Sequence, residues 1–209
     1  MKAPAPVRRR QVMKIARRVV LGLAIVLVLL IVAAFFMPRH ATVSRSVEIA
    51  APASVVFPMV GDLRRFNEWS PWFARDPAAV YTFTGPTDGV DQTMNWTSKD
   101  PDVGAGSMTV ERIEPEKVVV MAIAFAGEGD AQATITLEST GALTRVVWRF
   151  DSDLGFNPIA RYFGLMMDGR VGPDYERGLA RLKTVAEAAT PSGEAGPSSR
   201  PADASGPSQ

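Results

Sequence analysis

Apolar and polar positions alternate through most of the middle of the chain, between residues 42 and 153, in short runs separated by turn residues. Every second residue within a run is apolar, which predicts strands. In the last run, for example, Val146, Trp148 and Phe150 share one face. This pattern is typical of an antiparallel sheet covered on one side only. The predicted strands are TVSRSVEI, AVYTFT, QTMNWTS, SMTVERIEP, KVVVMAIAF, AQATITLEST and LTRVVWRFD.

A helical repeat of apolar residues follows the strands, from about residue 157 to residue 187. It predicts a long helix with one buried face, and only the predicted sheet is large enough to cover that face. Gly172 and Pro173 interrupt the repeat, so we predict a kink or a new helix start at this point. The apolar positions are Ile159, Tyr162, Phe163, Met166, Met167, Val171, Tyr175, Gly178, Leu179, Leu182 and Ala186.

Two short helices are predicted between the first and second strands, at residues 55–60 and 63–66, beginning after Pro52 and Asp62. An aromatic-rich loop follows and contains Trp69 and Trp72. These two indoles either gate the mouth of a pocket or hold the short helices against the sheet.

An uncharged segment of 19 residues, Val19 to Met37, contains 14 Val, Leu, Ile or Phe residues. As a helix it would be about 28 Å long, close to the thickness of the bilayer hydrocarbon, about 30 Å. The apolar core of a cleaved signal peptide is shorter and ends at a small-x-small site, whereas this segment continues through Phe35 and Phe36. We therefore predict an uncleaved membrane anchor.

Charge is distributed unevenly along the chain. Residues 1–18 contain seven Lys and Arg and no acidic residue, which predicts a cytoplasmic N-terminus and a periplasmic or extracellular domain. The remainder has 16 basic and 22 acidic residues, a net charge of −6 that disfavours nucleic-acid binding. The predicted order is a basic cytoplasmic tail (1–18), a transmembrane anchor (19–37), a folded domain (41–188) and a disordered tail rich in Pro, Gly, Ser and Ala (189–209).

Few residues suggest metal or catalytic chemistry. The chain has no cysteine, which excludes disulfides and thiolate chemistry, and His40 is its single histidine. Asp151 and Asp153 form a D-x-D pair at a strand end, which we interpret as a turn. Glu111 and Glu114 have odd spacing on a strand and face opposite sides. We expect no metal and no organic cofactor.

The order of the predicted elements, together with four segments, resembles the SRPBCC or START-like superfamily, in particular its polyketide cyclase/dehydrase and lipid transport branch. The segments are SVEIAAPASVVF, FNEWSPW, GAGSMTV and GPDYERGLARLK, and the resemblance covers about residues 41–188. It implies an α+β helix-grip fold, in which a curved antiparallel sheet of about seven strands surrounds the C-terminal helix and encloses an apolar cavity.

Inward positions of the strands and the helix would line this cavity, although each is also compatible with an ordinary core. Flexible methionines beside aromatic rings suit an adaptable apolar ligand. Alternation places one charged residue, Arg112, on the same inward face. If it is buried, it needs an acidic ligand group or an acidic partner; the alternative is that it reaches solvent at the end of the strand. The predicted lining is Met94, Trp96, Met108, Arg112, Met121, Ile123, Trp148, Tyr162, Met166 and Tyr175.

These observations predict a membrane-anchored binding protein for a hydrophobic small molecule or lipid. One alternative is a cyclase- or dehydratase-like enzyme that uses the same cavity, with Tyr162, Tyr175 or Arg112 as polar contacts. The other is a structural or interaction domain whose cavity is closed by side chains. The sequence shows no catalytic constellation, which favours binding over catalysis.

Overall fold

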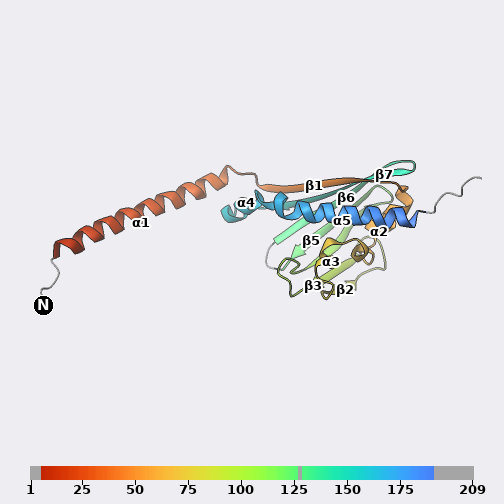
Figure 1. Cartoon of the computed structure of the whole chain (residues 1–209), viewed down its shortest axis with the longest axis horizontal. Helices are drawn as coiled ribbons and strands as arrows, with labels where there is room; N and C mark the ends of the chain where they lie inside the picture. Colours follow the sequence, from red (N-terminus) through yellow and green to blue (C-terminus); the bar gives the residue numbers. More distant parts are fainter. Residues whose placement is uncertain (1–5, 127–128, 191–209) are drawn as a thin grey trace, which may run out of the picture.

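The computed structural model describes residues 6–126 and 129–190 and has an α+β fold (Figure 1). Seven strands form one antiparallel sheet in the order β1-β7-β6-β5-β4-β3-β2. The predicted disordered tail (189–209) lies almost entirely outside the described residues. The strands are β1 (His40–Ile49), β2 (Val80–Thr84), β3 (Thr93–Thr97), β4 (Ala105–Glu114), β5 (Val118–Phe125), β6 (Gly129–Thr140) and β7 (Leu143–Asp153).

The predicted one-sided character of the sheet is confirmed. On β7, Val146, Trp148 and Phe150 are buried and the residues between them are more exposed. The register places Phe150 opposite Val43 of β1, and it places Trp148 between Ile135 of β6 and Arg45 of β1. One face of the sheet is therefore apolar and covered, and the other faces solvent.

The helix α5 (Met167–Ala189) covers the apolar face by lying along β1 and against the short helices α2 and α3 (Figure 1). A new helix start at Gly172-Pro173, one of the two predicted alternatives, is wrong, because α5 continues through Pro173. The other alternative, a kink at this proline, stays a prediction. A proline inside a helix is unfavourable by about 3 kcal/mol. Burial of one large apolar side chain stabilises the fold by about 1.5–3 kcal/mol. Because an unbroken α5 keeps Tyr175, Leu179 and Leu182 buried, the stabilisation from their burial is larger than the destabilisation caused by the proline.

The interruption lies earlier, at Leu165 and Met166, and separates α5 from a short helix α4 (Pro158–Gly164). Asn157 begins α4, since its side-chain oxygen accepts hydrogen bonds from the amides of Ile159 and Ala160 and Pro158 occupies the first helical position. The first part of the predicted long helix is thus an independent element.

The helix α2 (Ala53–Gly61) includes the first predicted short helix, but the second, at residues 63–66, is wrong. The chain instead forms a single 3-10 turn, η1 (Phe66–Glu68), and then α3 (Pro71–Arg75). Ser70 caps α3 by accepting a hydrogen bond from the amide of Phe73 at 3.3 Å. The Ser-Pro pair at residues 70 and 71 is a helix-start signal visible in the sequence, with a capping serine followed by proline at the first helical position.

The helix α1 (Pro6–Phe35) extends away from the domain (Figure 1). Within the described ranges it is the one helix that is long and apolar enough to cross a membrane, over Val12–Phe35. The helix begins well before the uncharged segment at Val19. Basic residues such as Arg17 and Arg18 therefore belong to the same helix as that segment.

Candidate functional site

The hydrophobic core on the inner face of the sheet contains most of the predicted cavity lining. Seven of the ten residues are buried in it, which agrees with the inward direction expected from alternation; their part in ligand binding remains a prediction. They are Met94, Trp96, Met108, Met121, Ile123, Trp148 and Tyr175.

Aromatic rings fill the centre of this core. The rings of Trp148 and Tyr175 stack with centroids 3.8 Å apart, and Trp69 meets Trp148 edge-on at 5.1 Å. A Cβ at Gly178 would lie 2.9 Å from the Trp148 ring and 3.1 Å from Pro71, so the space beside this glycine is occupied. Any ligand held at this point must displace side chains.

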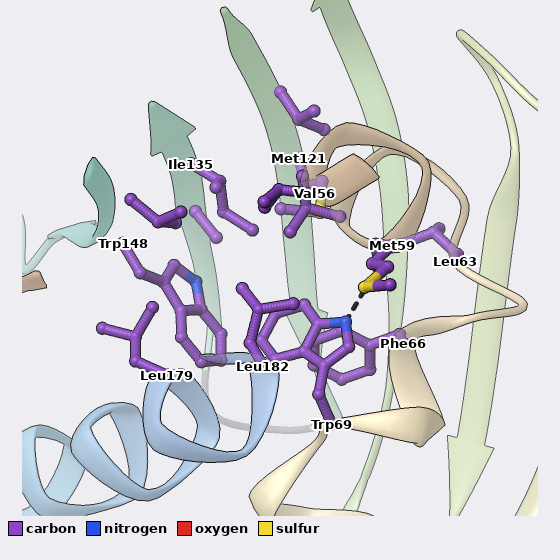
Figure 2. Close-up of a cluster of buried hydrophobic side chains, with 14 of the residues drawn as sticks. Val56, Met59, Leu63, Phe66, Trp69, Met121, Ile135, Trp148, Leu179 and Leu182 are labelled. Carbon is purple, nitrogen blue, oxygen red and sulfur yellow. Dashed lines mark hydrogen bonds between the residues drawn. The ribbon is translucent and has the colours of Figure 1, made fainter. Parts of the chain in front are cut away.

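The buried tryptophans differ in the hydrogen bonding of their indole N–H groups. Trp69 Nε1 donates to the carbonyl of Met59 at 2.9 Å (Figure 2), and Trp96 Nε1 donates to that of Val103 at 3.1 Å. Trp148 Nε1 is buried and has no acceptor among the described residues. A buried donor without a partner is unfavourable by about 1–3 kcal/mol. Trp148 therefore holds an unused hydrogen-bonding group on the inner face of the sheet.

Tyr175 provides a second polar group at the same place. Burial raises the pKa of its hydroxyl well above the ordinary value, and the negative charge of Asp151 raises that pKa further. The hydroxyl is therefore neutral and can donate or accept a hydrogen bond. Other buried polar side chains are used in local structure: Gln92 binds Asp62, Thr87 and Leu63, and Thr144 binds Ala51.

The two tryptophans predicted as a pocket gate pack against the core. Trp69 is fully buried, and Phe66 lies edge-on to it at 4.8 Å. Trp72 is half-buried, with its ring 5.9 Å from that of Trp148 and 6.3 Å from that of Tyr175. These contacts agree with the alternative reading, in which both indoles hold the short helices against the sheet and α5.

Arg112 does not face the interior, and this expectation is wrong. A β-bulge in β4 places Val110 opposite Met121 and Arg112 opposite Val120, so the alternation reverses after Val110. Ile113 packs against the core instead, and the exposed Arg112 pairs with Glu114.

Tyr162 and Met166 are also outside the space between the sheet and α5, because the chain is interrupted between α4 and α5. Met166 is exposed. Tyr162 lies beside α1 and donates its hydroxyl to the carbonyl of Leu30 at 2.8 Å. The expectation that these two residues line an internal cavity is wrong.

Asp151 and Asp153 pair with arginines at the end of the sheet. The Arg149 guanidinium and the Thr42 hydroxyl hold the pKa of Asp151 below its ordinary value. Hydrogen bonds from Arg39 and from the amide of Gly155 do the same for Asp153. Among the described residues, no group of three His, Cys, Asp or Glu side chains could hold a metal ion.

A hollow of about 510 Å³ lies on the opposite, solvent-facing side of the sheet. Small side chains such as Ser107, Ala122 and Ala124 leave this depression, and Glu111 and Asp130 add negative charge to its lining. An open, acidic surface of this kind does not suit an apolar ligand.

A seven-stranded antiparallel sheet closed by a long C-terminal helix defines the helix-grip, START-like class of proteins. The chain belongs to the polyketide cyclase/dehydrase and lipid transport family, whose model matches residues 40–187. This confirms the resemblance seen in the sequence, and the family suggests a domain that binds hydrophobic ligands. A search of the curated proteins found no match.

Solved structures with the same fold include three bacterial proteins. Protein CV1439 from Chromobacterium violaceum is 15% identical with a TM-score of 0.51, the match covering 70% of this chain and 97% of that one. Protein Ms6760 from Mycobacterium smegmatis is 17% identical with a TM-score of 0.51, covering 71% and 92%. A protein from Arthrobacter aurescens is 20% identical with a TM-score of 0.51, covering 69% and 87%. At these identities the similarity concerns the fold.

Proposed function

We propose that this protein binds an apolar molecule carrying an oxygen acceptor, such as a lipid with a hydroxyl, ester or carboxyl group, between its sheet and α5, while α1 anchors it in a membrane. The buried Trp148 N–H without an acceptor is the observation that supports this proposal most directly. A ligand oxygen at this position would satisfy the donor, and the surrounding side chains would contact the apolar part.

The inner face of the sheet supports an adaptable site. Met94, Met108 and Met121 lie on neighbouring strands and are buried. Methionine has three rotatable bonds, so a methionine-rich wall can change shape more easily than one built of β-branched residues. Rearrangement of these side chains is the means by which a ligand would enter an interior that is otherwise packed.

Replacing Trp148 with phenylalanine is expected to weaken retention of an oxygen-bearing ligand by about 2- to 10-fold, because one hydrogen bond of about 0.5–1.5 kcal/mol is lost while an aromatic ring remains. The measurement is native mass spectrometry of the full chain in detergent, loaded with a 16-carbon fatty acid. The alkane of the same length is the matched probe, and its retention should be unchanged by W148F.

Equal retention of the fatty acid by wild type and W148F would show that the Trp148 N–H does not bind the ligand. If the wild type retains neither probe and no apolar molecule is extracted from the purified protein, the ligand-binding proposal fails.

The second candidate function is an interaction domain with a closed interior. It is favoured by the Trp148–Tyr175 stack and by the close approach of Gly178 to Trp148. The enzymatic alternative has less support, because Arg112 and Tyr162, two of its three proposed polar contacts, lie outside the interior.

The anchoring part of the proposal is supported by the length of α1, by its uncharged apolar segment, and by the basic residues that precede that segment. We expect full-length protein to remain in the membrane fraction after alkaline extraction and to keep residues 1–37. Protease added from the periplasmic or extracellular side should digest the domain. A mature N-terminus near residue 38 and a soluble product would instead identify a cleaved signal peptide.

A further inference from the structure

Exposed apolar side chains gather at the end of the domain next to α1. Of the eight large apolar side chains exposed among the described residues 40–126 and 129–190, five belong to α4 or its flanking turns and are 52–74% exposed. Isolated apolar side chains on a surface are ordinary, whereas a cluster of five in eleven residues marks a contact surface. The five, called here the α4 patch, are Phe156, Ile159, Phe163, Leu165 and Met166.

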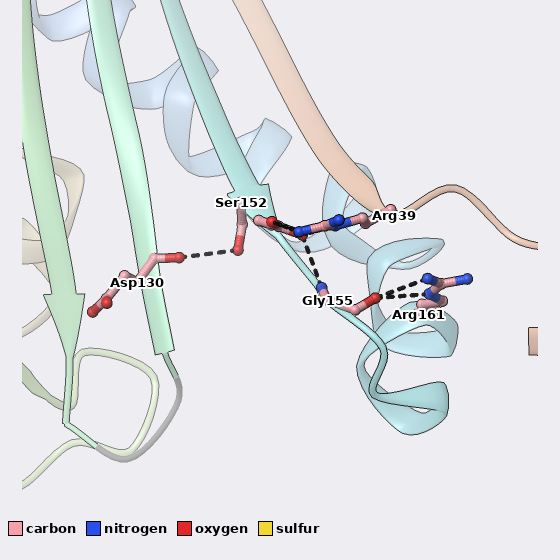
Figure 3. Close-up of polar contacts among 6 residues, drawn as sticks. Arg39, Asp130, Ser152, Gly155 and Arg161 are labelled. Atoms are coloured by element: carbon pink, nitrogen blue, oxygen red, sulfur yellow. Dashed lines mark hydrogen bonds and ion pairs between the residues drawn. The ribbon is translucent and has the colours of Figure 1, made fainter. Parts of the chain in front are cut away.

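Arg161 fixes α4 to the end of α1. Its side chain is buried although the guanidinium is charged, and it donates hydrogen bonds to the carbonyls of Ala34 at 3.2 Å and Phe35 at 3.1 Å. It also donates two bonds to the carbonyl of Gly155, at 2.8 and 3.0 Å (Figure 3). The last carbonyls of a helix lack partners within that helix and carry partial negative charge, so a guanidinium is well suited to cap them.

The hydroxyl of Tyr162 sets the depth of α4 relative to the anchor. It binds the carbonyl of Leu30, which at about 1.5 Å per residue lies roughly 8 Å along the helix before Phe35. Tyrosine is enriched at membrane–water interfaces, where its ring is apolar and its hydroxyl polar. Once α1 crosses a bilayer, α4 is therefore held at the level of the last apolar turns of α1.

Arg39 marks the polar side of this level. Its guanidinium lies 5.6 Å from the centre of the Phe156 ring and pairs with Asp153 at 2.6 Å. Phe36, 87% exposed, precedes it by three residues. The surface therefore changes from apolar at the patch to charged at Arg39 and Asp153. Groups follow the same order from the acyl chains of a bilayer to the surrounding water.

We propose that the α4 patch inserts into the headgroup–acyl boundary of the bilayer that α1 crosses, so that the domain lies in a fixed orientation against the lipid surface. This inference rests on the proposed membrane anchor. The Arg161 and Tyr162 hydrogen bonds hold α4 against the end of α1, so the patch adjoins the apolar helix that crosses the bilayer, and the same bilayer is the occupant of the patch. An amphipathic surface helix buries its apolar face by about 5–10 Å in this way.

The chain has no cysteine, so a single introduced cysteine can be labelled specifically. An environment-sensitive fluorophore would be attached at Ile159→Cys or Phe163→Cys in full-length protein reconstituted into phosphatidylcholine vesicles. Leu143→Cys is the matched control, since Leu143 is an exposed apolar residue at the opposite end of β7, about 30 Å away. Leu27→Cys in α1 reports the anchor itself.

Labels at residues 159 and 163 should emit at shorter wavelength than the label at 143, and iodide should quench them about fivefold less, as expected for insertion below the headgroups. Quenching equal to that at 143, with the label at 27 protected, would overturn the inference and leave the anchor intact. An accessible label at 27 would overturn the anchor, and the inference with it. Protection that disappears when protein is diluted in excess lipid would assign the patch to a second copy of the chain and also overturn the inference.

Discussion

Replacing Trp69 with alanine is expected to lower the free energy of unfolding of the domain by about 3–5 kcal/mol, the range for removal of a fully buried aromatic side chain. The indole has no exposed surface, packs edge-on against Phe66 and Trp148, and donates a hydrogen bond to the carbonyl of Met59. Its loss would leave a cavity beneath α2 and an unpaired carbonyl. Urea unfolding of the full chain in detergent measures the change.

Trp72→Ala is the matched control, because it removes the same side chain from a half-buried position three residues away. Its expected effect is about 1–2 kcal/mol, since only part of the ring is removed from water. If both indoles held the helices equally, or if Trp69 were a mobile gate, the two variants would destabilise the domain by similar amounts. That result would contradict the assignment of Trp69 to the core.

Replacing Arg161 with alanine is expected to release α4 from the end of α1. Hydrogen bonds to a charged donor contribute about 1.5–3 kcal/mol each, and Arg161 bonds to Ala34, Phe35 and Gly155. The population of the released state should therefore rise by at least about tenfold, and cleavage by a protease follows that population when reclosure is fast. Trypsin cleavage after Arg39, followed by mass spectrometry in detergent, measures it.

Arg170→Ala is the control for this experiment, since it removes an exposed arginine from α5 without altering the α1–α4 contact. Arg161→Lys should give an intermediate rate, because lysine keeps the charge but cannot donate to several carbonyls in the same fork geometry. A wild-type cleavage rate in Arg161→Ala would show that the guanidinium does not hold the two helices together.

The fold class could be predicted from local patterns in the sequence. Alternation along β6 and β7 sets which side chains face the helix, and the helical repeat of Tyr175, Leu179 and Leu182 sets which face of α5 is buried. Both patterns repeat over two to four residues, so a short stretch of sequence is enough to reveal them. The uncharged segment that became the end of α1 is recognisable for the same reason.

The errors in the candidate site arise where contacts between distant segments override local pattern. A single extra residue in β4 turns Arg112 outward, and the pairing with β5 that creates the bulge is not visible in β4 alone. Tyr162 fits the helical repeat of α5, yet it bonds to Leu30, 132 positions earlier in the chain. Periodicity describes which residues share a face, but it does not identify what that face will meet.

The residues of this protein specify a one-sided sheet, a long covering helix and an apolar N-terminal helix through short-range order in side-chain polarity. Only the folded molecule decides that aromatic rings fill the space under α5, that Trp148 is left with an unpaired donor, and that α4 is bound to α1. These features depend on distances between residues up to 132 positions apart, and such distances are set by the packing of the whole chain.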